Sequence, residues 1–155
     1  MDKYWKTAAV AVLTAIMATT ACKKDQNCSL HPEAFRFSII DRETGADLIE
    51  SGTYRTDNIG IHYFYNNQEQ ELIVNIEPNP DSHLIEMVSA QLPMVSLTGR
   101  SEIFYLVLDS QDTDTLTVVM GSEVRNGCNF HPYAVVKHNG KNLPIAEAKA
   151  FILEK

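Results

Sequence analysis

Two cysteines and two histidines stand in matching segments of the sequence. Cys28 and His31 precede one proline and Cys128 and His131 precede another, so both segments read Cys-x-x-His-Pro-x-Ala. Two cysteines and two histidines form a ligand set that zinc accepts. In an oxidising compartment two cysteines more often form a disulfide. We therefore favour a Cys28–Cys128 bond over free thiols or a metal site.

Three carboxylates form a second candidate site. Asp109, Asp112 and Asp114 lie within one short connection, and carboxylate oxygens are the ligands that calcium prefers. The connection lacks the glycine and the closing acidic residue of an EF-hand loop. Asp and Thr side chains also hydrogen-bond their own backbone in turns. We therefore favour a hairpin turn over a calcium site.

The remaining motifs predict no enzyme. The five histidines are dispersed without a His-x-x-x-His pair, and no Gly-x-Ser-x-Gly turn occurs. The sequence has no phosphate-binding or dinucleotide-binding fingerprint either. Carboxylate pairs for glycoside hydrolysis depend on a separation in space that the sequence does not give. We expect no catalytic residues and no cofactor; the alternative is a metal-binding or hydrolytic protein that uses the residues above.

The elements that must position these residues are predicted to be strands. Apolar and polar residues alternate with period two in 35–39, 59–65, 72–76 and 133–138. Ile103–Leu108 is a continuous apolar run, which predicts a central strand covered on both faces. We expect Thr115–Met120 to pair with it across the three aspartates, and Phe151–Leu153 to form the last strand. Leu84–Leu92 fits a helix or a strand, and we favour a strand.

These segments predict an all-β fold. About eight short strands separated by turn signals, without a long amphipathic helix, are typical of a single antiparallel β-sandwich, Ig-like or transthyretin-like. An open barrel is the alternative. Asn139-Gly140 is the strongest hairpin signal in the chain. We assign the sandwich domain to residues 34–155.

Six aromatic residues fall on or beside the predicted strands. An exposed aromatic strip could bind a sugar or a peptide, but we favour core positions because large rings dominate core burial. The six residues are Tyr54, Tyr63, Phe64, Tyr65, Phe104 and Tyr105.

The first 21 residues read as an export signal rather than as part of the fold. Lys3 and Lys6 form a basic head, and the apolar stretch from Thr7 to Met17 is followed by small residues. This order is typical of a cleaved secretory signal peptide. A retained membrane helix would need about 20 apolar residues, and this segment is shorter.

The cysteine that follows the signal extends this prediction. Cys22 comes directly after Ala18-Thr19-Thr20-Ala21, and this order resembles the lipobox of bacterial lipoproteins. The resemblance implies that Cys22 is acylated, with palmitate among its chains, and becomes the new N-terminus. Two or more acyl chains hold a protein firmly in a membrane. Residues 22–33 would then be a polar tether between the lipid and the domain.

A second resemblance covers roughly Phe104 to Leu153. An aromatic strand followed by Asp112-Thr-Asp-Thr-Leu116, Cys128 and His138-Asn-Gly-Lys141 is similar to small uncharacterised lipoproteins of Bacteroidota. The resemblance implies a β-sandwich on the outer membrane. It also implies that Thr115, within Asp114-Thr115-Leu116, is an O-glycosylation acceptor. The tether lacks the acidic patch of surface-exported members, which leaves the periplasmic and the surface face of the membrane both open.

The net charge and the export signal together indicate an envelope protein. The chain has a formal net charge of −7 and no basic cluster, which argues against a nucleic-acid partner because phosphate binding needs clustered Lys and Arg. We expect a membrane-anchored lipoprotein of the bacterial envelope, most simply of the outer membrane. Its domain would be a non-enzymatic binding or accessory module with a protein or glycan partner.

Overall fold

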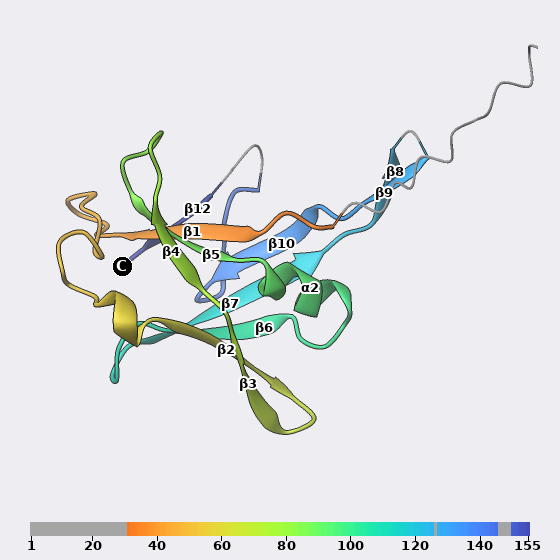
Figure 1. Cartoon of the computed structure of the whole chain (residues 1–155), viewed down its shortest axis with the longest axis horizontal. Coiled ribbons are helices and arrows are strands. Elements are labelled where there is room, and N and C mark those ends of the chain that lie inside the picture. Colours follow the sequence, from red (N-terminus) through yellow and green to blue (C-terminus); the bar gives the residue numbers. More distant parts are fainter. Residues whose placement is uncertain (1–30, 126, 146–149) are drawn as a thin grey trace, which may run out of the picture.

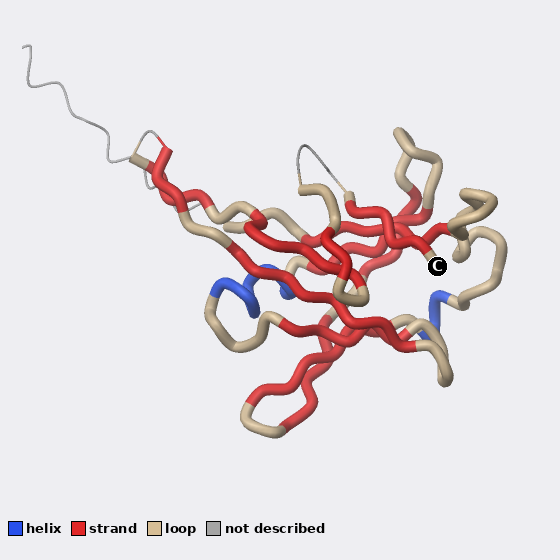
Figure 2. The backbone as a smooth tube through the Cα atoms, turned by 180° about the vertical axis from the view of Figure 1, so that it is seen from behind, coloured by secondary structure: helices blue, strands red, loops and turns tan. Residues whose placement is uncertain are grey.

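Most segments with alternating apolar residues form strands in the computed structural model of the protein, which describes residues 31–125, 127–145 and 150–155 (Figure 1). The predicted strand 72–76 is wrong, because residues 73–74 connect the end of one strand to the start of another in a different sheet. Helical residues in this part are confined to a 3-10 turn, η1 (Thr56–Asn58), and one short helix, α2 (Gln91–Leu97) (Figure 2). No described helix is long and apolar enough to cross a membrane.

One layer of the fold is a four-stranded sheet in the order β12-β1-β5-β4. Strand β1 lies at its centre, and its side chains alternate between the core and the outer face. The strands are β1 (Phe35–Ile40), β4 (Asn75–Pro78), β5 (Ile85–Ser89) and β12 (Phe151–Glu154).

The other layer is a six-stranded antiparallel sheet in the order β11-β10-β7-β6-β2-β3. Strands β6 and β7 lie at its centre, and the connection between them carries the three aspartates. The strands are β2 (Gly60–Tyr65), β3 (Gln68–Leu72), β6 (Ile103–Val107), β7 (Thr113–Met120), β10 (Tyr133–His138) and β11 (Lys141–Asn142).

The core lies between these two sheets. Every second residue of β1 is fully buried, and the facing strands β2, β6 and β7 bury their own alternate residues against it. The all-β sandwich prediction is therefore confirmed. The finer choice between an Ig-like and a transthyretin-like topology stays a prediction. The largest fully buried side chains are Phe35, Phe37, Phe104, Ile39, Ile61, Met87, Leu92, Leu106, Leu108, Leu116, Leu153 and Val118.

One strand pair departs from the antiparallel pattern. The C-terminal strand β12 runs parallel to β1, so that Phe37 lies opposite Phe151 and Ile39 opposite Leu153. This register places all four side chains on the core face. A shift by one residue would turn the apolar side chains of β12 toward solvent, so burial fixes the register.

Tight turns set the hairpin registers. The predicted Asn139-Gly140 turn joins β10 to β11, and both residues have positive φ, at 48° and 79°. Asn66 and Asn67 have φ values of 52° and 62° and join β2 to β3 in the same manner. Positive φ at both central positions gives the turn a twist that matches the strands, and Asn and Gly tolerate it best.

The prediction for Ile103–Leu108 is wrong in one respect. This segment does form a strand inside the sheet, but only one of its faces is covered. Phe104 and Leu106 are fully buried, while Ile103 is 49% and Tyr105 is 36% exposed. Strand β6 is hydrogen-bonded to a neighbouring strand on each side, so it lies inside the sheet. Those hydrogen bonds run within the sheet, and no other layer of described residues covers its outer face.

The ambiguous segment Leu84–Leu92 contains both candidate structures. Strand β5 occupies Ile85–Ser89, and α2 begins two residues later at Gln91. The Ser96 hydroxyl on α2 donates a 2.8 Å hydrogen bond to the Val118 carbonyl oxygen. The helix thereby packs against β7, and the predicted strand is correct only up to Ser89.

A small ribbon extends from the ends of β7 and β10. Strands β8 (Glu123–Arg125) and β9 (Cys128–Phe130) form it as a separate two-stranded sheet, and Figure 1 shows it projecting from the sandwich. Cys128 is half-buried and is not a free thiol. The signal peptide, Cys22 and Cys28 lie outside the described residues, so the predicted acylation and the Cys28–Cys128 pairing stay predictions.

The parallel pairing of β12 gives a stability prediction. Leu153→Ala removes a fully buried side chain and should lower the free energy of unfolding by about 3 kcal/mol. Ile152→Ala is the matched control on the outer face of the same strand and should cost less than about 1 kcal/mol. Urea unfolding of both variants measures the difference. Equal losses would contradict the observed register.

Candidate functional site

The connection between β6 and β7 is a hydrogen-bonded turn. Asp109 accepts the backbone N–H groups of Gln111 and Asp112 at its Oδ1 atom, at 2.7 and 2.9 Å. This is the side-chain-to-backbone turn that we favoured over a calcium loop. Asp109 is thus engaged in holding the turn, and the other two aspartates have different partners.

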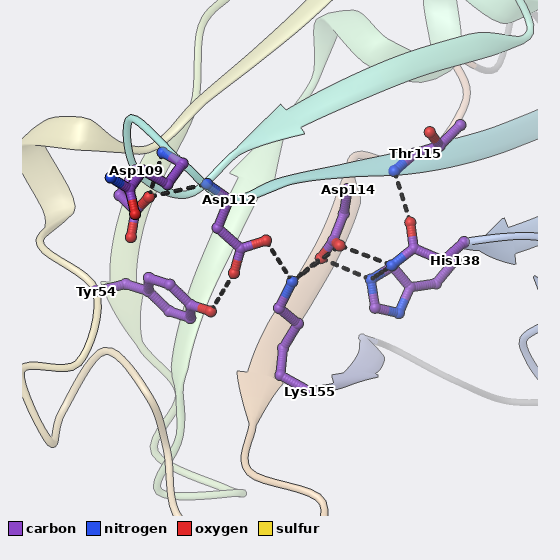
Figure 3. Close-up of polar contacts among 9 residues, drawn as sticks. Tyr54, Asp109, Asp112, Asp114, Thr115, His138 and Lys155 are labelled. Carbon is purple, nitrogen blue, oxygen red and sulfur yellow. Dashed lines mark hydrogen bonds and ion pairs between the residues drawn. The ribbon is translucent and has the colours of Figure 1, made fainter.

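Asp114 lies at the centre of a buried polar network (Figure 3). Its residue is 4% exposed because β7 directs alternate side chains into the sandwich. The Lys155 ammonium donates to both carboxylate oxygens at 2.9 Å, and the His138 Nε2 atom lies 2.8 Å from Oδ2. The Asn139 amide donates to Oδ1 at 2.6 Å. The carboxylate therefore has four contacts with three side chains.

Asp112 extends this network toward the other side of the sandwich. Its Oδ1 atom accepts a 2.7 Å hydrogen bond from the Lys155 ammonium, and its Oδ2 atom accepts one of 2.5 Å from the Tyr54 hydroxyl. Lys155 follows β12, Tyr54 precedes β2, and Asp112 precedes β7. The network therefore joins the C-terminus of the described chain to both sheets.

These contacts shift the pKa values of the charged groups. Burial opposes ionisation of Asp114, but the hydrogen bonds from Asn139, Lys155 and His138 outweigh it and lower the pKa of the carboxyl. Burial also opposes the charge of Lys155, and the bonds to Asp112 and Asp114 outweigh it and raise the pKa of the amine. Burial and the adjacent Asp112 raise the pKa of Tyr54. The Asp114 carboxyl and the Lys155 amine are therefore both charged at neutral pH and form an ion pair.

The contacts of His138 determine how its ring is held. A His–Asp pair orients the imidazole in hydrolytic triads, where a hydroxyl or thiol completes the set. Among the described residues, the side chain of His138 is hydrogen-bonded only to Asp114 and Asn139. The backbone N–H of Thr115 donates to the Asn139 side-chain oxygen at 2.9 Å. The geometry thus fixes His138 and the turn after β10 in place.

The described candidate metal ligands do not form a metal site. No group of three or more His, Cys, Asp or Glu side chains in this part of the chain is arranged to hold a metal ion. The Lys155 ammonium lies between Asp112 and Asp114, where a calcium ion would have to bind. His31 and His131 are not part of this network, and both line a pocket beside the β8–β9 ribbon.

The predicted glycosylation acceptor lies on the outer face of the six-stranded sheet. Thr115 alternates with the buried residues Asp114 and Leu116 and stands opposite Tyr105 in the register of β6 and β7. Its modification stays a prediction. Tyr105 itself contacts Phe64 on β2, with ring centroids 5.8 Å apart in an edge-to-face arrangement.

Sequence reasoning assigned only Asp112 and Asp114 to a common site and missed the other four side chains of the network. The alternation of β10 placed His138 on the same face as buried Val136, and this signal could have identified it as a core histidine. Tyr54 and Lys155 stand 58 and 43 positions from Asp112. No local pattern connects residues at such separations, so only the fold brings them together.

Comparison with protein-family profiles, with curated protein sequences and with solved structures finds no match to this chain.

The network gives a prediction that depends on pH. The pKa of Asp114 is lowered in the fold, so its stabilising contribution is complete above the unfolded pKa of about 4 and is lost as the pH falls through the folded value. Asp114→Asn should cost about 3 kcal/mol of unfolding free energy at pH 7 because it breaks a buried ion pair. In urea unfolding, the difference in unfolding free energy between Asp114→Asn and the wild type should shrink as the pH falls through the acid range.

The exposed Asp81 supplies the control for this series. Asp81→Asn should change the free energy of unfolding by less than about 0.5 kcal/mol at every pH. A loss in Asp114→Asn that stays constant between neutral and acid pH would contradict the assigned role of the carboxylate.

Proposed function

We propose that this protein is a lipid-anchored lipoprotein of the bacterial envelope whose β-sandwich is a non-enzymatic binding module. The sequence supports the anchor through the export signal and Cys22. The structure supports a binding role through the uncovered face of the six-stranded sheet. Of the residues that the alternative metal-binding or hydrolytic function would use, Asp109 accepts hydrogen bonds from its own turn. Asp112 and Asp114 are both bonded to Lys155.

The uncovered face is the observation that carries the proposal. Phe64 is 54%, Ile103 is 49% and Tyr105 is 36% exposed, and all three lie on the outer side of neighbouring strands. Monomeric soluble domains rarely leave large contiguous apolar patches on their surface, and such patches mark interaction sites. We call Phe64, Ile103 and Tyr105 the outer patch.

The shape and composition of the outer patch fit a protein partner. A sheet face presents a broad and even surface, and the aromatic pair Phe64 and Tyr105 lies within it rather than in a cleft. Aromatic residues are enriched at the centres of protein interfaces, where a polar rim surrounds them. Glu69 stands beside Phe64, and Thr115 and Thr117 stand beside the other two residues.

The anchor is tested by removing its attachment point. Cys22→Ser should abolish incorporation of labelled palmitate in the native host and move the protein from the membrane pellet to the soluble envelope fraction, because the acyl chains provide the attachment. Ser29→Ala is the control in the same segment and should leave both readouts unchanged. Labelled palmitate in Cys22→Ser would refute acylation at this cysteine.

The outer patch is tested by cross-linking in living cells. The photoreactive residue p-benzoylphenylalanine replaces Tyr105 in one strain, Phe64 in a second and Val124 in a third. Val124 is 69% exposed but lies on the β8–β9 ribbon, so it is the control. We expect one discrete protein adduct from Tyr105 and Phe64 and none from Val124. An identical adduct pattern from all three positions, or no adduct from the outer patch, would contradict the proposal.

A further inference from the structure

The His-Pro pairs of the two matching segments line the same pocket although 100 residues separate them. His31 and His131, each with the proline that follows it, line one pocket of about 560 Å³. The pocket lies between the chain that leads into β1 and the ribbon of β8 and β9. This volume falls within the range of about 300–1,000 Å³ that small-molecule sites occupy.

The floor of this pocket is aromatic and rigid. Tyr133 and Phe151 line it, and their rings meet edge to face with centroids 5.5 Å apart. Both rings also contact the buried ring of Phe35, at 5.9 and 5.1 Å. The Tyr133 hydroxyl donates a 2.8 Å hydrogen bond to the Glu33 carbonyl oxygen, which fixes the ring against the incoming chain.

Two imidazoles at this pocket have no polar partner among the residues that the structure describes. Within the described part of the chain, neither His31 nor His131 forms a hydrogen bond or an ion pair, whereas His62 contacts Glu69 and His138 contacts Asp114. The Nδ1 atom of His131 is also buried without a partner. No contact fixes which ring nitrogen carries the proton, so each ring can offer a lone pair to an N–H donor.

One of the described charged side chains at the rim has no ion-pair partner, and its charge is negative. Arg36 is paired with Glu77 at 2.7 Å and Glu86 at 3.2 Å. Arg125 is paired with Glu123 at 2.5 Å. Among the described charged residues that line the pocket, this leaves the Glu33 carboxylate without an ion pair.

The pocket already accommodates a cation of its own. The Arg125 guanidinium lies over the Phe130 ring, 5.6 Å from its centroid, while it pairs with Glu123. Burial raises the pKa of Tyr133, and the charge of Glu33 raises it further. Aromatic faces and carboxylates together are the groups that bind organic cations.

We propose that this pocket binds a small organic cation, with an ammonium or guanidinium group on an aromatic or branched apolar body. The apolar body packs on Tyr133 and Phe151. The cationic head faces Glu33, and His31 and His131 accept its N–H groups. This site is separate from the outer patch, so its test does not depend on the partner proposed above.

Tryptamine is the probe, and calorimetric titration of the full chain, isolated from host membranes in detergent, is the measurement. Indole-3-propionate has the same ring and the opposite charge, and detergent buffer is the blank for both. We expect saturable heat with tryptamine and none with indole-3-propionate. Equal binding of the two compounds, or no binding of tryptamine above the blank, would overturn the proposal.

Three variants locate the binding in this pocket. Glu33→Gln should weaken tryptamine about threefold, the size expected for an exposed charge pair. Ala34→Leu fills the pocket from its wall and should abolish binding. Glu50→Gln removes an exposed carboxylate elsewhere and should change nothing, and the urea midpoint of each variant confirms that it is folded. Unchanged affinity in folded Glu33→Gln and Ala34→Leu would place tryptamine elsewhere and refute the site.

Discussion

The ion pair between Lys155 and Asp114 is the interaction on which the closure of the sandwich depends. It joins the end of β12, in the four-stranded sheet, to β7, in the six-stranded sheet. A buried ion pair adds little net stability, because desolvation offsets the attraction, but an unpaired charge in the same place is costly. Any register of β12 that removed the ammonium would leave the buried Asp114 carboxylate without its lysine counter-charge, with only the described contacts from His138 and Asn139. The pair therefore acts together with burial of Leu153 to select one position for the last strand.

This closure makes the two faces of the six-stranded sheet unequal. The inner face packs against β1 and β12, with Phe104 and Leu106 fully buried. The outer face keeps the Phe64–Tyr105 contact in solvent. Burial of the inner face supplies the hydrophobic core, whereas the apolar side chains on the outer face stay exposed to solvent.

The pocket beside the β8–β9 ribbon is lined by other residues than those of the outer patch. It forms where the residues before β1 meet the turn between β9 and β10. If Cys22 carries the lipid, the segment that reaches the membrane begins at the wall of this pocket. A small ligand there and a protein on the outer patch would then contact separate surfaces of the same domain.

The sequence by itself determined most of the strands, the hairpin turns and the faces of many residues, because these follow from local periodicity and turn chemistry. The alternation around Phe37 predicts a half-buried strand, and the Asn139-Gly140 pair predicts a tight hairpin turn. The structure contains both features. Only the tertiary structure decided that Lys155 meets Asp114, that β12 runs parallel to β1 and that Tyr105 stays exposed. These features depend on which distant segments pack together. That packing depends on the burial of apolar side chains over the whole chain, and a short segment of sequence does not contain this information.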